Sequence, residues 1–313
     1  MWLWLSMISN VPTSQDLNKS ALTAFFAAWH QLIQLFDDFN QSFGLENEDF
    51  LEELEQYYGH CQAELETIYS LAAQASELAL KARICEVSPF LLLLGNSSSF
   101  GESESDLDFS ELRTIDAVDL PNAVNAICAS KVSDGFKQRY TEIRKVRNKI
   151  AHLGGSGKQS APREVMKLLV DQYAELWPGA QFLNNWINYI GSRRYSFFHD
   201  GKWTSAEMEL ADIQETFFSL LSKGEFKKLV GFQKSQRRYI CHTCVYNGGL
   251  DRHGIGTSLT TAFLVEKNTL RCQLCTETTE VVREDCNQDD CKGDVISDSK
   301  FNGESCHTCG QQQ

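Results

Sequence analysis

Apolar residues recur every three or four positions through the first two-thirds of the chain, which is the spacing of amphipathic α-helices. From Leu51 to Ala79 this alternation is strict over four heptads, and its alanines favour a closely packed helical bundle over a coiled coil. A bundle core explains this stripe better than a cofactor-binding surface does. The pattern predicts helices over residues 16–43, 51–79, 134–153, 163–177, 180–191 and 206–222.

Small and polar residues indicate where these helices begin and end. Ser205 is placed to cap the start of the last helix, and Gly224 follows its end. The pair at 154–155, two glycines, should end the helix that begins near residue 134. Pro121 should kink or break a further helix that starts near Ser110, before a second helical piece that runs through Cys128.

Beyond residue 224 the helical period is lost. Residues 237–240 and 258–265 have the character of short strands, and Asn247-Gly248 is typical of a hairpin turn. All prolines lie before residue 179, whereas eight of the 11 cysteines lie between Cys241 and Cys309. The chain therefore divides into a helical part and a cysteine-rich part of loops and short strands.

The charge balance limits the class of protein. The 313 residues include 29 basic and 42 acidic side chains, a net charge of −13, which excludes a uniformly basic nucleic-acid binder. The longest apolar run, Ala24–Trp29, is far shorter than the ~20 residues of a membrane-spanning helix. The apolar N-terminus lacks the basic flank of a signal peptide. We therefore expect a cytoplasmic protein that does not bind membranes.

One predicted helix ends in the most informative motif of the chain, the hexapeptide 147–152, which reads Arg-Asn-Lys-Ile-Ala-His. On a helix of about 3.6 residues per turn, Arg144, Asn148 and His152 lie along one stripe, and Arg147 lies one residue around from it. The apolar residues of this helix mark a largely different face, so the polar groups should be exposed. The alternative is that the arginine binds neighbouring carbonyls and the histidine caps the helix.

The charge around this motif favours a phosphate ligand. Residues 131–167 carry ten basic and three acidic side chains, a net of +7 within an acidic protein. Such a patch attracts polyanions, and the binding weakens with salt. Guanidinium groups match phosphate oxygens, and histidine transfers protons near neutral pH. The motif therefore predicts phosphodiester cleavage.

The Arg-Asn-x3-His motif at the end of an amphipathic helix, inside a helical region, resembles the active-site motif of the HEPN superfamily (higher eukaryotes and prokaryotes nucleotide-binding domain). The resemblance covers roughly residues 16–190, and the motif is its one specific feature. It implies a helical bundle that forms a homodimer, in which two motif helices face each other across a composite cleft. It also implies an endoribonuclease with no metal in its catalytic site. Some members of the family bind nucleotides or act as scaffolds without cleaving RNA.

The resemblance assigns a role to each residue of the motif. Arg147 would hold the scissile phosphate, His152 would take part in proton transfer or stabilise the developing charge, and Asn148 would orient the pair. The nucleophile would be the 2′-OH of the RNA itself, which leaves a 2′,3′-cyclic phosphate and a 5′-OH. The basic residues beside the motif are expected to contact RNA: Arg144, Lys145 and Lys149.

The cysteines of the C-terminal part are spaced as metal ligands. Two cysteines two residues apart form a tight turn that binds one side of a tetrahedral ion, and a second pair completes the site. Eight ligands make two structural zinc sites, and the reducing cytoplasm argues against disulfides. The histidines at 242, 253 and 307 are then not needed as ligands, although interleaved pairing is an alternative. The predicted ligands are Cys241, Cys244, Cys272, Cys275, Cys286, Cys291, Cys306 and Cys309.

This part resembles two zinc ribbons with opposite charge. Residues 227–271 carry a net of +6, and residues 276–304 a net of −6. The first ribbon could therefore contact RNA through Arg237 and Arg238, with Tyr239 available to stack on a base. The alternative is that both ribbons mediate protein contacts.

The sequence thus predicts a mainly α protein, a HEPN-like helical bundle followed by two small zinc-ribbon modules with four cysteine ligands each. The expected domains are an N-terminal extension (1–15), the helical domain (16–224) and the ribbons (225–280 and 281–313). The expected function is metal-independent RNA cleavage by a homodimer in antiviral defence or as a toxin, controlled by a regulatory or antitoxin protein. The alternatives are a catalytically inactive adaptor that binds RNA or a protein partner, and a structural assembly subunit.

Overall fold

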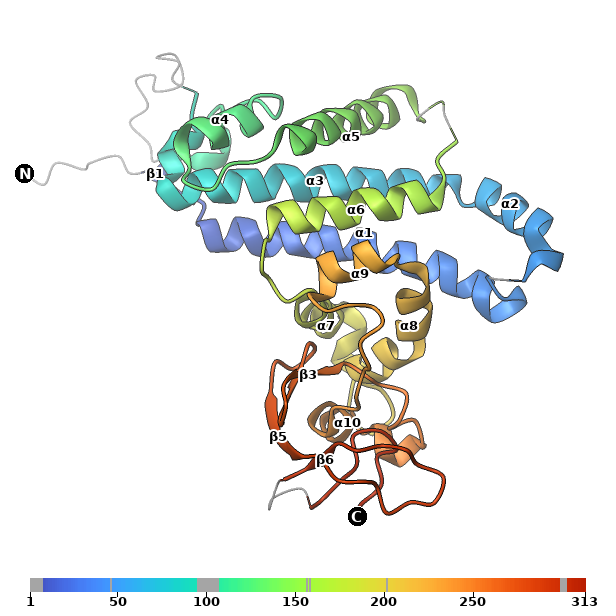
Figure 1. Cartoon of the computed structure of the whole chain (residues 1–313). Helices are drawn as coiled ribbons and strands as arrows, with labels where there is room; N and C mark the ends of the chain where they lie inside the picture. The colour runs from blue at the N-terminus through green and yellow to red at the C-terminus, as the bar shows by residue number, and fades with distance from the viewer. Residues whose placement is uncertain are drawn as a thin grey trace, which may run out of the picture. The chain divides into compact units, whose positions relative to one another are not determined.

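The computed structural model describes residues 8–45, 47–94, 107–155, 157, 159–200, 202–298 and 303–313. The chain forms two compact units. Unit 1 consists of Met1–Leu32 and Leu51–Pro178, and unit 2 of Ile33–Phe50 and Gly179–Gln313. The long helix α1 (Ser14–Phe43) contributes residues to both (Figure 1).

Unit 1 is a helical bundle built around α3 (Gln62–Val87). This helix packs against α4 (Leu120–Ile127), α5 (Asp134–Leu153) and α6 (Pro162–Leu176), and α2 (Leu51–His60) precedes it. Short 3-10 helices lie at Pro89–Leu92 and Phe109–Glu111, and the two-residue strands β1 (Ile8–Ser9) and β2 (Leu107–Asp108) pair in parallel. The predicted bundle core is confirmed along α3, where small side chains are buried and let neighbouring helices approach closely: Ala72, Ala75 and Ala79.

Aromatic side chains fill the rest of this core. The ring of Phe25 lies 5.2 Å from that of Tyr173 and 5.4 Å from that of Trp177, between centroids. A buried amide adds directional contacts, because Nε2 of Gln172 donates to the carbonyl of Ala72 at 2.8 Å. Burial of this much aromatic surface contributes strongly to the cohesion of unit 1.

Local residues set both ends of α5. The hydroxyl of Ser133 accepts a hydrogen bond from the backbone N–H of Phe136 at 3.1 Å, which caps the first turn. Gly154 follows the last turn with φ of 77°, a left-handed conformation that glycine adopts without strain. The predicted bounds of this helix are confirmed.

Two predictions for unit 1 need correction. The apolar stripe from residue 51 to 79 is carried by two helices, because the chain leaves the helical geometry at Cys61, between α2 and α3. The first helical piece expected after Ser110 is wrong beyond Glu111, where the chain is not helical, whereas the second piece expected through Cys128 is confirmed by α4. Pro121 lies in the first turn of α4, where its missing N–H costs nothing, so it starts a helix instead of breaking one.

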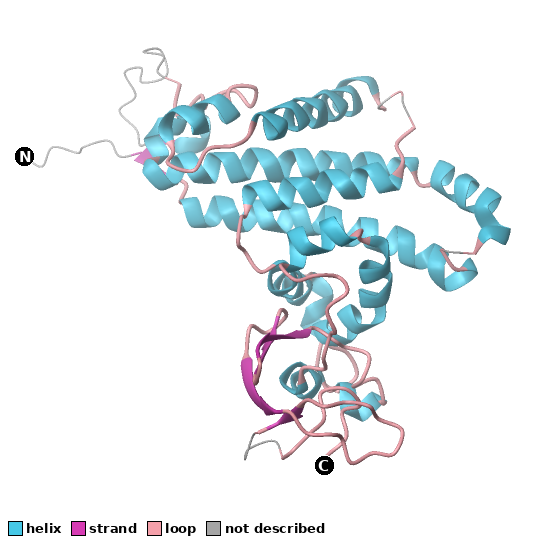
Figure 2. Ribbon diagram, in the orientation of Figure 1, coloured by secondary structure: helices cyan, strands magenta, loops and turns pink. Residues whose placement is uncertain are grey.

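Unit 2 combines helices with a small antiparallel sheet (Figure 2). Its helices are α7 (Phe182–Ser192), α8 (Ala206–Leu220), α9 (Lys223–Val230) and α10 (His242–Gly248), with 3-10 helices at Glu48–Phe50, Arg194–Phe198 and Leu250–His253. Its sheet has the order β3 (Ala262–Glu266), β4 (Thr269–Cys272), β5 (Thr278–Val282), β6 (Ile296–Ser297). Ser205 caps α8 as predicted, accepting from the N–H of Met208.

The helices α9 and α10 contradict the prediction that helical structure stops at residue 224. Ser222 and Glu225 form a reciprocal capping box that starts α9, so Gly224 lies inside this helix. Asn247-Gly248 ends α10 rather than forming a hairpin turn. Both helices are short, so neither shows enough turns of hydrophobic period to be recognised by pattern alone.

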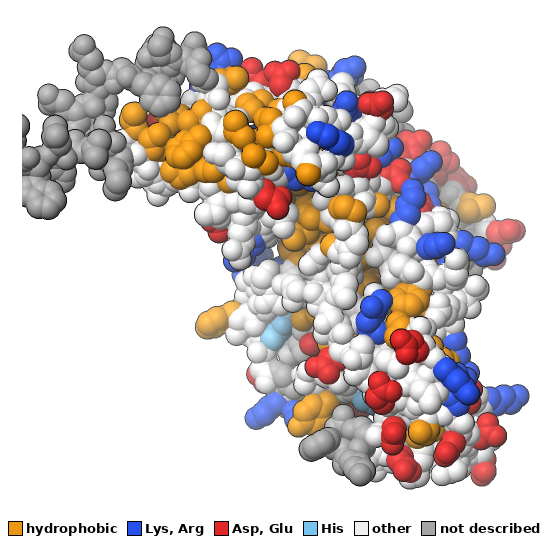
Figure 3. Space-filling view, turned by 60° about the vertical axis from the view of Figure 1, so that its left-hand side comes forward, with side chains coloured by type: hydrophobic (Ala, Val, Ile, Leu, Met, Phe, Trp, Pro, Cys, Tyr) orange, Lys and Arg blue, Asp and Glu red, His pale blue; other side chains and the backbone are white. Residues whose placement is uncertain are grey.

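The surface differs between the units. At the end of unit 1 formed by the last turn of α3 and the following 3-10 helix, hydrophobic side chains gather on one face (Figure 3). Val87 and Phe90 are 55% and 53% exposed there. Over unit 2 the same view shows hydrophobic side chains mostly one at a time among polar and charged ones. Within the part of the chain that the structure describes, no helix has the length and apolarity that crossing a membrane requires.

Candidate functional site

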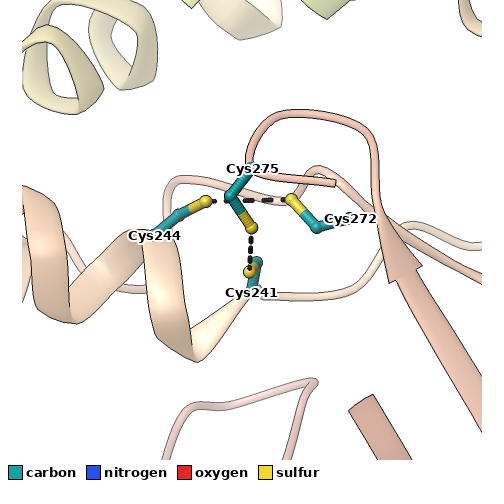
Figure 4. Close-up of side chains that lie close together, drawn as sticks. All are labelled: Cys241, Cys244, Cys272 and Cys275. Carbon is teal, nitrogen blue, oxygen red and sulfur yellow. Dashed lines mark hydrogen bonds between the residues drawn. The ribbon is translucent and has the colours of Figure 1, made fainter. Parts of the chain in front are cut away.

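The first cysteine cluster joins the start of a helix to a turn of the sheet (Figure 4). Cys241 precedes α10 and Cys244 lies in its first turn, while Cys272 ends β4 and Cys275 lies in the turn that follows. The sulfur atoms of Cys241 and Cys275 are 3.6 Å apart, and those of Cys244 and Cys272 are 3.7 Å apart. All four ligand atoms lie within 4.8 Å of one another.

The second cluster is built from loops and a turn near the end of the chain, and its first pair is separated by four residues instead of two. The sulfurs of Cys286 and Cys309 are 3.7 Å apart, and those of Cys291 and Cys306 are 3.9 Å apart. The sequence-adjacent pairs therefore assemble as predicted, and the interleaved alternative is excluded. Gly293 follows the first pair, where a Cβ would lie 2.8 Å from the sulfur of Cys306, so no larger residue fits.

Both clusters fit a tetrahedral metal ion. Four sulfurs at ~2.3 Å from a central zinc would be ~3.8 Å from one another, which matches the measured separations. Backbone N–H groups also point at the sulfurs, as from Leu274 to Cys272 at 3.3 Å and from Thr308 to Cys306 at 3.4 Å. Such bonds stabilise thiolates, the form that binds metal.

The crowding of the thiols shows why a cation suits this site. The pKa of Cys244 is raised, chiefly by its hydrogen bond to Cys241 and next by its bonds to the other two thiols of the cluster. Hydrogen bonds from Cys241, Cys244 and Cys275 lower the pKa of Cys272 well below its usual range. Four adjacent thiolates repel one another, so all four ionise together only when a positive ion compensates the charge.

The two clusters share one fold. The rings of His242 and His307, one from each Cys-His-Thr-Cys segment, lie 4.5 Å apart between centroids. A ring nitrogen of His307 lies 2.8 Å from the carbonyl of Ile240, and the N–H of Ile240 donates to the carbonyl of His307 at 2.9 Å. Strand β6, beside the second cluster, pairs with β5, beside the first. These contacts explain the histidines as structural side chains between clusters that are complete without them.

The motif of α5 lies on the surface of unit 1. Arg147 and His152 are exposed and Asn148 is half-buried, so none of them is sealed in the core. Arg147 and Asn148 contact each other, with Nη1 of the arginine donating to the amide oxygen at 3.2 Å. Lys145 and Lys149 are exposed on the same helix, and the sequence prediction of an accessible basic patch is confirmed in this respect.

Arg147 lines a groove between α3 and α5. The groove has a volume of about 500 Å³, and α3 contributes Thr67, Ser70, Leu71, Gln74, Glu77 and Leu78 to its wall. Glu77 places a carboxylate in the same groove as the guanidinium. Glu77 is itself paired with Lys81 at 2.7 Å, which offsets part of its repulsion of a phosphate beside Arg147.

Arg147 and His152 do not converge within one chain. Five residues along an α-helix correspond to a rise of ~7.5 Å and a rotation of ~140°. With Arg147 directed to the α3 groove, His152 faces another side of the helix. Arg144 is closer to Arg147 than to the histidine along the helix, and its guanidinium lies 5.8 Å from the ring of Tyr140.

Tyr140 anchors this helix and is no acid–base group. Its hydroxyl donates to the carbonyl of Ala117 at 2.7 Å, and it is 1% exposed. Burial raises the pKa of Tyr140 well above its usual value, more than the nearby arginines lower it.

Arg237 and Arg238, which the sequence predicts to contact RNA, make contacts within unit 2. The guanidinium of Arg238 lies 4.0 Å from the ring centroid of Phe218 and 3.2 Å from a carboxylate oxygen of Glu215. Arg237 donates to the hydroxyl of Thr308 at 3.1 Å. Both side chains thus have local partners, and their contact with RNA stays a prediction.

A different segment of unit 2 carries the features that a stacking surface needs. Residues 193–203 interleave basic and aromatic side chains, and most of these rings are exposed. Periodicity does not reveal the segment, because it is neither a regular helix nor a strand. The composition of the segment would have revealed it, because three basic and four aromatic residues lie within eleven positions.

These observations define the protein as mainly helical, with a small antiparallel sheet and two four-cysteine clusters near the C-terminus. No protein-family model matches the chain, and no curated protein or solved structure is significantly similar to it.

Proposed function

We propose that the protein is an endoribonuclease of the HEPN type whose two four-cysteine clusters each hold a structural zinc ion. The observation that carries the proposal is the exposure of Arg147 and His152 at the C-terminal end of α5, beside the exposed Lys145 and Lys149. A buried motif could not reach a polyanion, whereas this one presents guanidinium, imidazole and ammonium groups to solvent.

The chemistry follows from the groups present. The 2′-OH of the RNA attacks the adjacent phosphorus, and the bond to the 5′-oxygen breaks. The guanidinium of Arg147 stabilises the charge on the phosphoryl oxygens, Asn148 holds that guanidinium in place, and His152 moves a proton at the attacking or leaving oxygen. The products are a 2′,3′-cyclic phosphate and a 5′-OH. This reaction requires no metal, and the zinc ions serve the fold.

The separation of the two side chains supports a homodimer. Within one chain Arg147 and His152 face sides of α5 that are ~140° apart, so one copy alone surrounds a phosphate poorly. Two copies that pair through α5 would place the arginine of one protomer near the histidine of the other. Isologous pairing of this kind is the commonest symmetry among oligomers.

We place this activity in the cytoplasm, in antiviral defence or as a toxin, with a regulatory or antitoxin protein as partner. An unregulated ribonuclease harms its own cell, so its activity needs control. Zinc bound by thiolates persists in a reducing compartment, in which disulfides do not. This role rests on the resemblance of the motif.

The test is cleavage of single-stranded RNA by zinc-loaded protein in buffer without added divalent metal, followed by a second assay in EDTA. Zinc content is measured in both buffers, so that loss of the fold is not mistaken for loss of a catalytic metal. We expect Arg147→Ala and His152→Ala each to reduce cleavage by about 10² to 10⁴-fold. An RNA with a single 2′-deoxy position should resist cleavage there.

The control is Lys19→Ala, which removes an exposed cation of α1, outside the basic patch of residues 131–167, so cleavage should be unchanged. If the wild type and all variants show no detectable cleavage, with and without candidate partners, the hypothesis of a catalytically inactive adaptor replaces that of an enzyme. The adaptor has one observation in its favour, since Glu77 gives Arg147 an acidic neighbour in its groove.

A further inference from the structure

The segment from Tyr195 to Trp203 exposes an unusual amount of aromatic surface. Tyr195, Phe197, Phe198 and Trp203 are 53%, 86%, 72% and 76% exposed. Among the described residues, seven aromatic side chains are largely exposed, and four of the seven lie in this segment. Aromatic rings left in water forgo the free energy that burial would return, so such a concentration indicates a binding surface.

Hydrogen bonds constrain the described parts of the backbone that carry the rings. The carboxylate of Asp200 accepts hydrogen bonds from the N–H groups of Lys202 at 2.8 Å and Trp203 at 2.9 Å. The Nε2 of His253 donates to the carbonyl of Lys202 at 2.5 Å, which ties this loop to the 3-10 helix at Leu250–His253. The hydroxyl of Ser196 donates to the carbonyl of Arg193 at 2.5 Å. The exposed rings therefore lie on an ordered scaffold, which lowers the entropic cost of binding.

Positive charge is interleaved with the rings. The guanidinium of Arg194 lies 4.8 Å from the ring centroid of Tyr195, stacked as a cation on a π face. Lys202 is exposed beside Trp203. Residues 193–203 contain three basic side chains, of which Arg193 is paired with Glu209 at 2.7 Å, and one acid, Asp200, which accepts two backbone N–H groups at one oxygen. This local excess contrasts with the net charge of −13 of the chain.

We propose that Arg194, Tyr195, Phe197, Phe198, Lys202 and Trp203 form an aromatic platform that binds single-stranded RNA by base stacking. The rings of Phe197 and Phe198 lie 5.4 Å apart between centroids and are perpendicular, so each offers its face to a different base. Exposed rings with cations beside them match bases and phosphates, because each base offers a π face and each phosphate a charge. An acidic protein surface would also meet these cations, so affinity for RNA is the property that the experiment measures. The choice of RNA as the ligand rests on the proposed function. The platform would be the surface that captures the RNA substrate.

The experiment measures binding of fluorescently labelled oligonucleotides of about 12 nucleotides, U-rich and A-rich, to the full zinc-loaded chain. The chain carries Arg147→Ala and His152→Ala so that the probe is not cut. Phe197→Leu and Trp203→Leu keep an apolar side chain and remove the π face. Each should raise the Kd for RNA roughly 5- to 100-fold, whereas Phe197→Trp should bind as tightly as Phe197 or more tightly.

The control variant is Phe90→Leu, which changes a ring of unit 1 that is 53% exposed, as Tyr195 is, and should leave the Kd unchanged. Zinc content and circular dichroism confirm that each variant is folded. Arg194→Gln should weaken binding and reduce the salt dependence. The slope of log Kd against log salt should change by about 0.7 if this arginine neutralises one phosphate.

Equal RNA affinity of the leucine variants and the parent overturns the platform. Binding of the parent to vesicles of phosphatidylcholine and phosphatidylserine, abolished in the leucine variants while RNA binding is not, also overturns it in favour of a membrane surface. Failure of the proposed function is distinguishable. Ring-dependent RNA binding by a chain that never cleaves RNA contradicts the enzyme alone, and cleavage unaffected by Phe197→Leu and Trp203→Leu contradicts the platform alone.

Discussion

Unit 1 and the C-terminal part of unit 2 are stabilised by different chemistry. Unit 1 buries aromatic and alanine side chains along helices of up to 26 residues within it, so its cohesion is spread over many contacts. Residues 238–313 have strands of two to five residues and long connections, and they gather eight sulfur atoms into two clusters. On the proposed zinc binding, their cohesion is concentrated in a few ligands.

This difference predicts which substitutions reduce the stability of each unit most. A bundle loses stability in small steps when single side chains are truncated, because the remaining contacts persist. A metal-bound segment loses most of its folding free energy when one ligand or the ion is removed. The comparison predicts large, localised effects in the cysteine clusters and small, graded effects in unit 1.

The largest expected effect is that of zinc removal. A strong chelator should unfold residues 241–313 while α3 and α5 stay helical, since structural zinc contributes apparent free energies of ~10–16 kcal/mol in small domains. Hydrogen exchange read by mass spectrometry should show reduced protection in peptides of the cluster region and retained protection in Asp134–Leu153.

A single ligand substitution should act in the same direction. Cys272→Ser should reduce bound zinc from two ions per chain to one, as measured by atomic absorption. Its control is Cys128→Ser, a thiol of unit 1 whose sulfur donates to the carbonyl of Arg83 at 3.3 Å, which a serine hydroxyl can replace. Full protection of residues 241–313 in the chelator would show that zinc does not hold this region.

The cysteine ligands could be predicted from sequence because the chemistry is local. A Cys-x2-Cys turn fixes two ligands by itself, and tetrahedral geometry then determines what the second pair must do. The bounds of α5 were equally predictable, since Ser133 and Gly154 act within one turn of the residues that they cap. In both cases the determinants lie within a few residues of their effect.

Other features depend on contacts that the sequence does not show. The pairing of His242 with His307 needs two segments more than sixty positions apart to fold together. The exposure of Phe197 cannot be read from a pattern, because a buried and an exposed phenylalanine have the same letter. Arg147 faces α3 and His152 does not. This difference follows from helix geometry once the packing face of α5 is known.

An intermediate effect is expected from Gly293→Ala. The added Cβ would lie 2.6 Å from the hydroxyl oxygen of Thr308 and 2.8 Å from the sulfur of Cys306, closer than such atoms approach. We expect a cost of about 1–3 kcal/mol, seen as weaker zinc binding by the second cluster in a competition titration with a chromogenic chelator.

The control for this substitution is Gly224→Ala in α9. A Cβ there meets nothing within 4 Å, and alanine is the better helix former, so stability should rise by about 0.5–1 kcal/mol. Unchanged zinc affinity in Gly293→Ala would mean that the loop between Cys291 and Cys306 relaxes to make room, and that the second cluster is less rigid than the geometry implies.

The smallest expected effect lies in unit 1 and tests the graded side of the comparison. Ser133→Ala removes the hydroxyl that caps α5 and that also donates to the carboxylate of Glu175 at 3.1 Å. The expected cost is about 1 kcal/mol in the free energy of unfolding, without loss of zinc. Ser133→Thr keeps the cap, and Thr141→Ala removes an exposed hydroxyl from the middle of α5, so both should be nearly neutral. Urea unfolding, with exchange of the α5 peptide as the local probe, measures the three variants. A destabilisation above ~4 kcal/mol, or release of zinc by Ser133→Ala, would contradict the view that unit 1 yields in small, independent steps while the clusters fail at once.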